Sequence, residues 1–435
     1  SIELTEPFAD TVQRSRKVDL KLDDAARDQL LPALSMLLSG SANVGIDLSN
    51  TERQAVTADL SSSVLSLPWI GWSKGAGIAA TTAFQMERSG DQTFLHGFGI
   101  QGESFAVGGE VSLDEAGLTK ASFPRVRLNR GDDFSVDIQR RGRGYAIAVK
   151  GQALDARSLI KALRATSEAA GGTVANPVPI QLDLNVATIT GFGNETLRDV
   201  VIDYSGTGST IENLTVSAVT GSGARLEVSH GIGQAGRFLR ADTGDAGAVL
   251  RFLDLYSRME GGSMRVDLRG AEGGALVGRV AAREFWLVDE PRLASLVSTP
   301  SDDRGRSLND VVRGQLNVQR VFFDRALSGI KQGKGYLSLE NGVIRGPNIG
   351  STFQGTVYDE AGNMSMTGTF MPAYGINSLF AEIPLIGQIL GNGRDRGLIG
   401  ITFKLAGSTE APQLQINPLS AIAPGIFRSV FEFAE

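Results

Sequence analysis

Apolar and polar residues alternate along most of the chain with the period of two that is typical of β-strands. In residues 264–269, for example, Met264, Val266 and Leu268 alternate with Arg265, Asp267 and Arg269. Comparable runs recur from the first tenth of the chain to its last, separated by short polar turns such as NRGDD, RRGRG and DEAGN. This pattern predicts antiparallel strands joined by hairpins, with one apolar and one polar face.

Helical spacing is confined to a few short segments. It occurs in residues 23–38, 158–170, 246–259 and 291–297, with Gly261-Gly262 expected to stop the third. These helices are too few to cover the apolar face of a sheet with roughly fifteen or more strands. A second sheet could cover that face, as in a β-sandwich, or a ligand could. Of these we favour a mainly β fold: an elongated, twisted antiparallel sheet curled into a groove, capped or plugged by a few short helices.

Composition excludes several classes of function. The chain has 435 residues, a net charge of −6, 54 glycines and no cysteine. Nucleic-acid binding requires a positively charged surface, which a net negative charge does not favour, so we expect no nucleic-acid partner. The absence of cysteine excludes disulfides, zinc–thiolate sites and thiol catalysis. The glycines, about 12% against a usual level of roughly 7%, fit a chain with many turns.

Two glycine motifs suggest chemistry, but their surroundings argue against it. GIGQAG at 231–236 matches a dinucleotide loop, yet we detect no parallel βαβ organisation and predict a hairpin turn. GWSKG at 71–75 matches a nucleophile elbow, for which Ser73 would need a strand–turn–helix and a histidine, either His96 or His230. We instead expect the tryptophans beside it, Trp69 and Trp72, to anchor a strand end.

No metal or cofactor site is expected. The acidic pairs Asp132-Asp133 and Asp302-Asp303 lie in polar stretches and predict solvated turns rather than calcium sites. With no catalytic constellation in the sequence, we predict that the protein is not an enzyme and that it has no cofactor.

The C-terminal end carries an unusual concentration of apolar residues. In GINSLFAEIPLIGQIL and IAPGIFRSVFEF they recur at helical spacing, and Pro384 is expected to start a second short helix. These segments either form a lid on the last strands or contact a bilayer. The residues concerned are Leu379, Phe380, Ile383, Ile386, Leu390, Ile426, Phe427 and Phe431. No stretch of the chain reaches the roughly 20 apolar residues of a membrane span.

The C-terminal part of the chain resembles the AsmA-like proteins, in particular their YhdP-type C-terminal region. The resemblance rests on GTFMPAYGINSL, IPLIGQILG and GLIGITFKLAGSTEAPQLQINPLSAIAPG, and upstream on DAGAVLRFLDLYSRMEGGSMRVDL and REFWLVDEPRLASLVS. The first half matches more loosely, through LSLPWIGWSKGAG and GQALDARSLI.

This resemblance implies a bridge-like lipid transfer protein of a Gram-negative envelope. The expected location is the periplasm, anchored to the inner membrane by an N-terminal helix that would precede Ser1, with the C-terminal end at the outer membrane. The expected partners are phospholipids, carried through a hydrophobic β-groove without chemistry. The alternative is a non-enzymatic scaffold or assembly factor for outer-membrane proteins.

We expect residues 1–300 to form a β-rich groove segment with short helices, and residues 301–435 to form the AsmA-like β segment ending in apolar helices, the two making one continuous groove. The residues predicted to line the groove lie on the apolar side of the strand-like runs. They are Val136, Ile138, Ile147, Leu182, Leu184, Leu214, Val216, Val266, Leu268, Met366, Phe403 and Leu405.

Overall fold

The structure is a computed structural model, and it describes residues 2–5, 16–31, 34–168, 177–208, 210–234, 236–298, 318–347, 349–372, 401–409 and 411–417. Within these residues the protein is mostly β-strand, in open sheet that does not close on itself, with four short α-helices. The predicted fold class, a mainly β, curled groove with few helices, is confirmed. The chain divides into two compact units, unit 1 up to Ala218 and unit 2 from Val219, with residues 166–172 grouped with unit 2. The domain boundary expected from the sequence, between residues 300 and 301, lies outside the described residues. Unit 2 has strands before and after this position.

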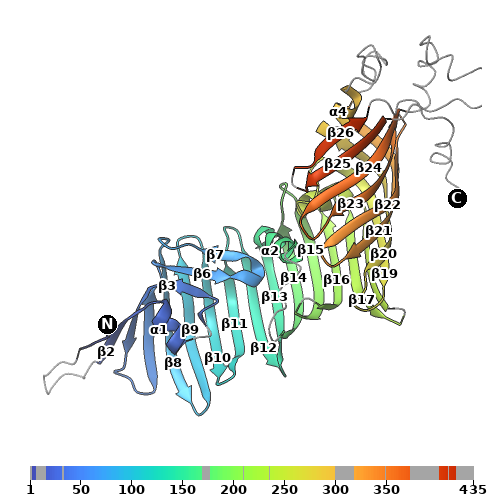
Figure 1. Ribbon diagram of the computed structural model, residues 1–435. Helices are drawn as coiled ribbons and strands as arrows, with labels where there is room; N and C mark the ends of the chain where they lie inside the picture. Colours follow the sequence, from blue (N-terminus) through green and yellow to red (C-terminus); the bar gives the residue numbers. More distant parts are fainter. Residues whose placement is uncertain are drawn as a thin grey trace, which may run out of the picture. The chain divides into compact units, whose positions relative to one another are not determined.

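Unit 1 contains one long sheet (Figure 1), and the strands named in the next sentence are hydrogen-bonded to one another in the order given. Its strands are β1 (Ile2–Thr5), β2 (Lys17–Leu22), β4 (Ala42–Asp47), β5 (Arg53–Asp59), β8 (Ala80–Ser89), β9 (Gln92–Gly102), β10 (Ala106–Asp114), β11 (Gly117–Arg127), β12 (Asp133–Arg141), β13 (Gly144–Asp155), β14 (Pro179–Thr190) and β15 (Thr196–Thr207). The next strand, β16 (Thr210–Thr220), contains the division between the units.

Most neighbouring strands are antiparallel hairpins, as the alternation predicts. The turn in RRGRG, for example, has Gly142 at φ 59°, a conformation that glycine adopts easily. One pair differs. β13 and β14 are parallel, and the chain passes between them through α2 (Arg157–Glu168). The expectation that no βαβ unit is present was therefore wrong, because the helical segment after β13 is long enough to return the chain to the same end of the sheet.

A second, three-stranded sheet covers part of one face of unit 1. It consists of β3 (Leu38–Gly40), β6 (Ser63–Leu67) and β7 (Trp72–Lys74), with α1 (Asp24–Leu30) and the 3₁₀ turn η2 (Pro68–Ile70) nearby (Figure 1). Leu65 and Trp72 of this small sheet pack with Ala58 and Ile100 of the long sheet. The indole of Trp72 donates a hydrogen bond to the carbonyl of Leu128 (2.9 Å), so Trp72 does anchor a strand, whereas Trp69 is 58% exposed.

Unit 2 contains the strands β17 (Arg225–Gly233), β18 (Gly236–Thr243), β19 (Met259–Gly270), β20 (Leu276–Val288), β21 (Arg320–Gly333), β22 (Tyr336–Arg345), β23 (Ile349–Tyr358), β24 (Asn363–Pro372), β25 (Ile401–Ser408) and β26 (Gln413–Asn417). Each is antiparallel to the next. The helices α3 (Ala246–Phe252) and α4 (Pro291–Ser298) pack on the apolar face of this sheet, where Ala246, Leu293 and Leu296 contact a core that includes Phe323 and Phe370. They plug part of the face, as expected.

The helix α3 is shorter than predicted. The spacing suggested a helix up to Met259, but it ends at Phe252 and Asp254 has φ 54°. A left-handed residue at this position ends a helix, so Tyr256 lies beyond it. The hydroxyl of Tyr256 instead donates a hydrogen bond to Glu290 (2.5 Å), which links the segment after α3 to the start of α4.

Candidate functional site

The apolar face of unit 2 contains a row of residues that are neighbours across nine consecutive strands. We call it the unit 2 row, and every member is apolar or glycine. It consists of Leu239, Leu268, Gly278, Ile330, Leu339, Gly355, Met366, Leu405 and Leu414. Three residues predicted to line a groove, Leu268, Met366 and Leu405, are thus brought onto one line that crosses β18–β26. Leu268 and Met366 are buried, whereas Leu339 and Leu405 are partly exposed.

The length of the unit 2 row can be compared with that of a lipid tail. Adjacent strands are about 4.8 Å apart, so the row extends over about 38 Å, whereas one tail spans half of a bilayer core of about 30 Å. An alkyl chain lying across the strands would therefore cross only apolar residues and glycines.

A parallel row beside it combines aromatic rings with glycines. Val266 lies between Ala241 and Val280 in register. On β22–β26 the same face carries Gly342, Phe353, Gly368, Phe403 and Ile416. A Cβ at Gly342 would lie 2.2 Å from the Phe353 ring, and one at Gly368 would lie 2.5 Å from the Phe403 ring. Each ring therefore lies over the glycine of the neighbouring strand, so part of the glycine excess serves ring packing rather than turns.

A cavity of about 720 Å³ lies against β22–β26, and its lining includes Phe353, Phe403, Ile416 and the charged Lys404. Ligand pockets usually have volumes of about 300–1,000 Å³, so this cavity is large enough for part of a lipid. Phe403, a predicted groove residue, is one of its walls.

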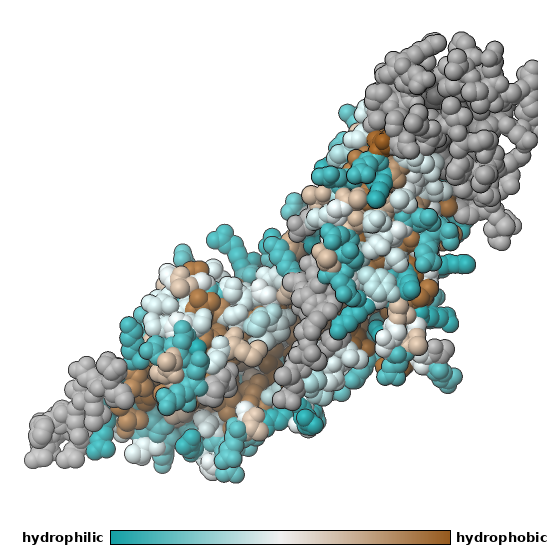
Figure 2. Space-filling view, viewed as in Figure 1, coloured by the Kyte–Doolittle hydropathy of each residue, from teal (hydrophilic) through white to brown (hydrophobic). Residues whose placement is uncertain are grey.

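The long sheet of unit 1 has an apolar row of the same kind, which we call the unit 1 row. It consists of Met86, Leu95, Val111, Ala121, Ile138, Ile147, Leu182 and Tyr204. Beside it Val136 is paired with Val149, and Val149 with Leu184. Most members are partly exposed, and Figure 2 shows hydrophobic side chains gathered in a hollow of this unit. Five predicted lining residues, Val136, Ile138, Ile147, Leu182 and Leu184, therefore form one contiguous surface.

Two further residues predicted to line the groove, and those predicted for the apolar C-terminal end, do not belong to either row. Leu214 and Val216 lie on β16 and are partly buried, while Thr215 and Ser217 are exposed. The apolar residues at the C-terminal end, from Leu379 to Leu390 and from Ile426 to Phe431, lie outside the described residues.

The two motifs that suggested chemistry have the surroundings of ordinary strands. The motif spans the end of β17 and the start of β18, with Gly233 opposite Gly236, so it belongs to a hairpin as predicted. Ser73 is exposed in the middle of β7, where it pairs with Ser66, so it does not stand on a strand-to-helix turn. The neighbouring Lys74 is buried, and its ammonium group donates hydrogen bonds to the carbonyls of Leu60 (2.5 Å) and Ser63 (2.7 Å). Burial lowers the pKa of this lysine.

Asp132 is not in a solvated turn as expected. It is only 5% exposed, and its carboxylate accepts hydrogen bonds from the backbone N–H groups of Leu128 (3.2 Å), Asn129 (2.7 Å) and Asp155 (2.8 Å). Burial raises its pKa, while these hydrogen bonds act in the opposite direction. Its role is to hold the β11–β12 loop against β13. Asp302 and Asp303 lie outside the described residues.

The comparisons with known proteins do not decide the family. No family model, curated protein or solved structure matches this chain. The resemblance to the AsmA-like proteins stays a prediction. Among the described residues, no group of three or more acidic or histidine side chains is arranged to hold a metal ion, and none of the helices is long and apolar enough to cross a membrane.

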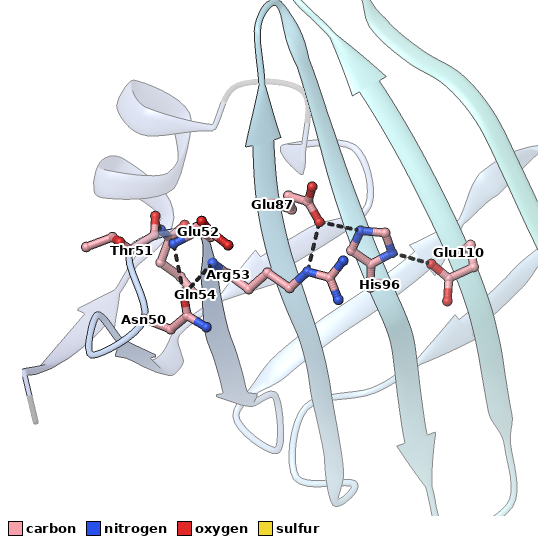
Figure 3. A network of polar contacts seen from close by, with 8 residues as sticks. All are labelled: Asn50, Thr51, Glu52, Arg53, Gln54, Glu87, His96 and Glu110. Carbon is pink, nitrogen blue, oxygen red and sulfur yellow. Dashed lines mark hydrogen bonds and ion pairs between the residues drawn. The ribbon is translucent and has the colours of Figure 1, made fainter. Parts of the chain in front are cut away.

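A polar network in unit 1 links the solvent-facing sides of four strands (Figure 3). Glu87 on β8 accepts from Arg53 on β5 (2.9 Å) and is 3.1 Å from Nε2 of His96 on β9. Nδ1 of His96 is 3.0 Å from Glu110 on β10. A carboxylate can only accept hydrogen bonds. The His96 ring can therefore donate to Glu87 and Glu110 at the same time when both of its nitrogens carry a proton.

We expect this network to be a surface link with a small energetic role. Replacing His96 by Asn should lower the free energy of unfolding by no more than about 1 kcal/mol, because exposed ion pairs are weakened by water and salt. Urea titration of both proteins checks this. A loss of several kcal/mol would show that the ring also has a role in packing.

Proposed function

We propose that this chain carries phospholipid along the apolar faces of its open sheets, without a chemical step. The observation that supports this most directly is the pair of apolar rows, which cross eight strands in unit 1 and nine in unit 2 and remain partly exposed among the described residues. Apolar surface of this extent is uncommon on a soluble protein unless something binds to it.

The energetic reason for such a surface is the cost of exposing lipid tails to water. A lipid with about 30 methylenes in its tails would face on the order of 20 kcal/mol or more in crossing an aqueous space, at about 0.8 kcal/mol for each methylene. A row of apolar side chains removes most of that cost for a tail lying on it, while the headgroup stays in water at the open margin.

The sequence resemblance supports a more specific version of this proposal. We propose transport between the inner and outer membranes of a Gram-negative envelope by an AsmA-like protein in the periplasm. An N-terminal helix would hold it in the inner membrane, and its C-terminal end would face the outer membrane. Phospholipids are then its partners.

The test is to look for lipid on the protein and to locate it. Photo-crosslinking amino acids at Val266 and Phe403 should capture phospholipid, whereas the same group at the adjacent position 265 should not, since that side chain alternates to the opposite face. Mass spectrometry of the purified protein should also find bound phospholipid. Lipid-free protein whose crosslinks join only protein segments would contradict the proposal, and a stoichiometric protein partner without lipid would favour a scaffold.

A further inference from the structure

One cationic side chain lies on the apolar face of unit 2. Arg237 is the second residue of β18, and its register neighbours are Ile232 on β17 and Gly270 on β19. Leu239 and Ala241, which belong to the apolar rows, lie two and four residues further along the strand, so Arg237 shares their face. The next position along β19 from Gly270 on this face is Leu268 of the unit 2 row. Arg237 therefore stands at the margin of the apolar face, next to the hairpin turn.

No described carboxylate pairs with Arg237. The arginines that alternate to the opposite face behave differently: Arg265 pairs with Asp242 (2.5 Å), and Arg240 lies 3.7 Å from Asp267. A partly buried guanidinium on an apolar surface loses hydration, which is costly unless an anion replaces the water.

A second unpartnered group lies beside Arg237. His230 is opposite Leu239 in register, is only 5% exposed, and its Nδ1 atom has no hydrogen-bond partner. The pKa of His230 is lowered by burial and also by the charge of Arg237, which places the two side chains within electrostatic reach of each other. A buried polar atom without a partner is uncommon in folded proteins.

We propose that Arg237 binds the phosphate of a phospholipid at the margin of the apolar face, with the imidazole of His230 beside it, and that the tails of this lipid lie along the row that starts at Leu239. This proposal rests on the proposed lipid-carrying function. A phosphodiester carries one negative charge and several acceptor oxygens, and guanidinium matches it with two parallel N–H donors. The phosphate would supply the anion that Arg237 lacks and a partner for His230 Nδ1.

The test compares two lipids that differ in the phosphate. The full chain is mixed with detergent micelles containing either dioleoylphosphatidylglycerol or dioleoylglycerol, and native mass spectrometry counts the lipid retained. Wild-type protein should retain the phospholipid better. Arg237→Gln should weaken retention of the phospholipid about tenfold, the effect of losing one or two charge-assisted hydrogen bonds, and leave dioleoylglycerol unchanged. The matched control is Arg240→Gln, on the same strand and the opposite face, which should behave as wild type.

A spectroscopic readout tests the position of the phosphate. The chain has two histidines, so His96→Asn leaves the ring signals of His230 alone in the NMR spectrum. Adding dioleoylphosphatidylglycerol micelles should shift these signals, and the shift should disappear when Arg237→Gln is added to the same background.

The outcomes separate the two proposals. If wild type retains neither lipid, the lipid-carrying function itself is wrong. If it retains both lipids and Arg237→Gln changes neither, the function stands and the phosphate site is overturned. If inorganic phosphate alone shifts the His230 signals as far as the phospholipid does, the site binds small anions and its assignment to a lipid is overturned.

Discussion

Val266→Asp will abolish most of the lipid bound to unit 2 while leaving the fold intact. Val266 is partly exposed on β19, between Ala241 and Val280, and next to Leu268 of the unit 2 row. A carboxylate here can stay hydrated when the face is empty, but a tail lying over it would remove that water at a cost of several kcal/mol. We expect the phospholipid captured by a photo-crosslinking group at Phe403 of unit 2 to fall at least about tenfold, with little change in the melting temperature.

The matched control is Val277→Asp on the adjacent strand. Val277 is 51% exposed and lies on the opposite face of β20, so the same substitution there should leave lipid binding unchanged. Lipid is quantified by mass spectrometry and folding by circular dichroism during heating. If Val266→Asp unfolds the protein, Val266 belongs to a sealed core; if both variants lose lipid equally, the effect is not specific to the apolar face.

Phe370→Ala will strongly destabilise unit 2. Phe370 is 1% exposed and belongs to the core that α3 and α4 form with the sheet. Removing a fully buried phenylalanine ring costs about 3–5 kcal/mol, because the lost burial is followed by a cavity that the surroundings fill incompletely. Hydrogen exchange measured by mass spectrometry should show faster exchange in β19–β25.

Thr367→Ala is the control for this prediction, since Thr367 lies on the same strand and its side chain is exposed. A surface substitution of this kind usually changes the free energy of unfolding by less than about 0.5 kcal/mol. If Phe370→Ala changed exchange as little as Thr367→Ala, the helices and the sheet would not share one cooperative core.

Much of the fold could be predicted from alternation alone, because a strand with one buried face repeats every two residues. The strands around Val266, Met366 and Phe403 follow that rule. Features that depend on contacts distant in sequence could not be predicted in this way. The small sheet β3–β6–β7 is short and has no alternation to detect, and the parallel β13–β14 pair depends on where α2 returns the chain.

The candidate site was predictable only in part, for a related reason. Alternation identified individual apolar residues such as Leu268 and Leu405, but the register of nine strands is needed to place them on one line. Arg237 was missed because alternation separates it from Arg240 without showing which of the two faces is the apolar one, and only the pairing of β18 with its neighbours decides this. Asp132 was misplaced because its partners at Leu128 and Asp155 are backbone groups, which the sequence does not distinguish.

The rings of Phe353 and Phe403, which lie over Gly342 and Gly368, have a consequence for how a bound molecule would move. A sheet whose side chains stood upright would be corrugated, and an alkyl chain would have to climb from one strand to the next. Rings that occupy the space over the glycines make this surface more even, so the attraction changes less from strand to strand. On such a surface an alkyl chain would slide along the sheet more easily than it would stay bound at one position.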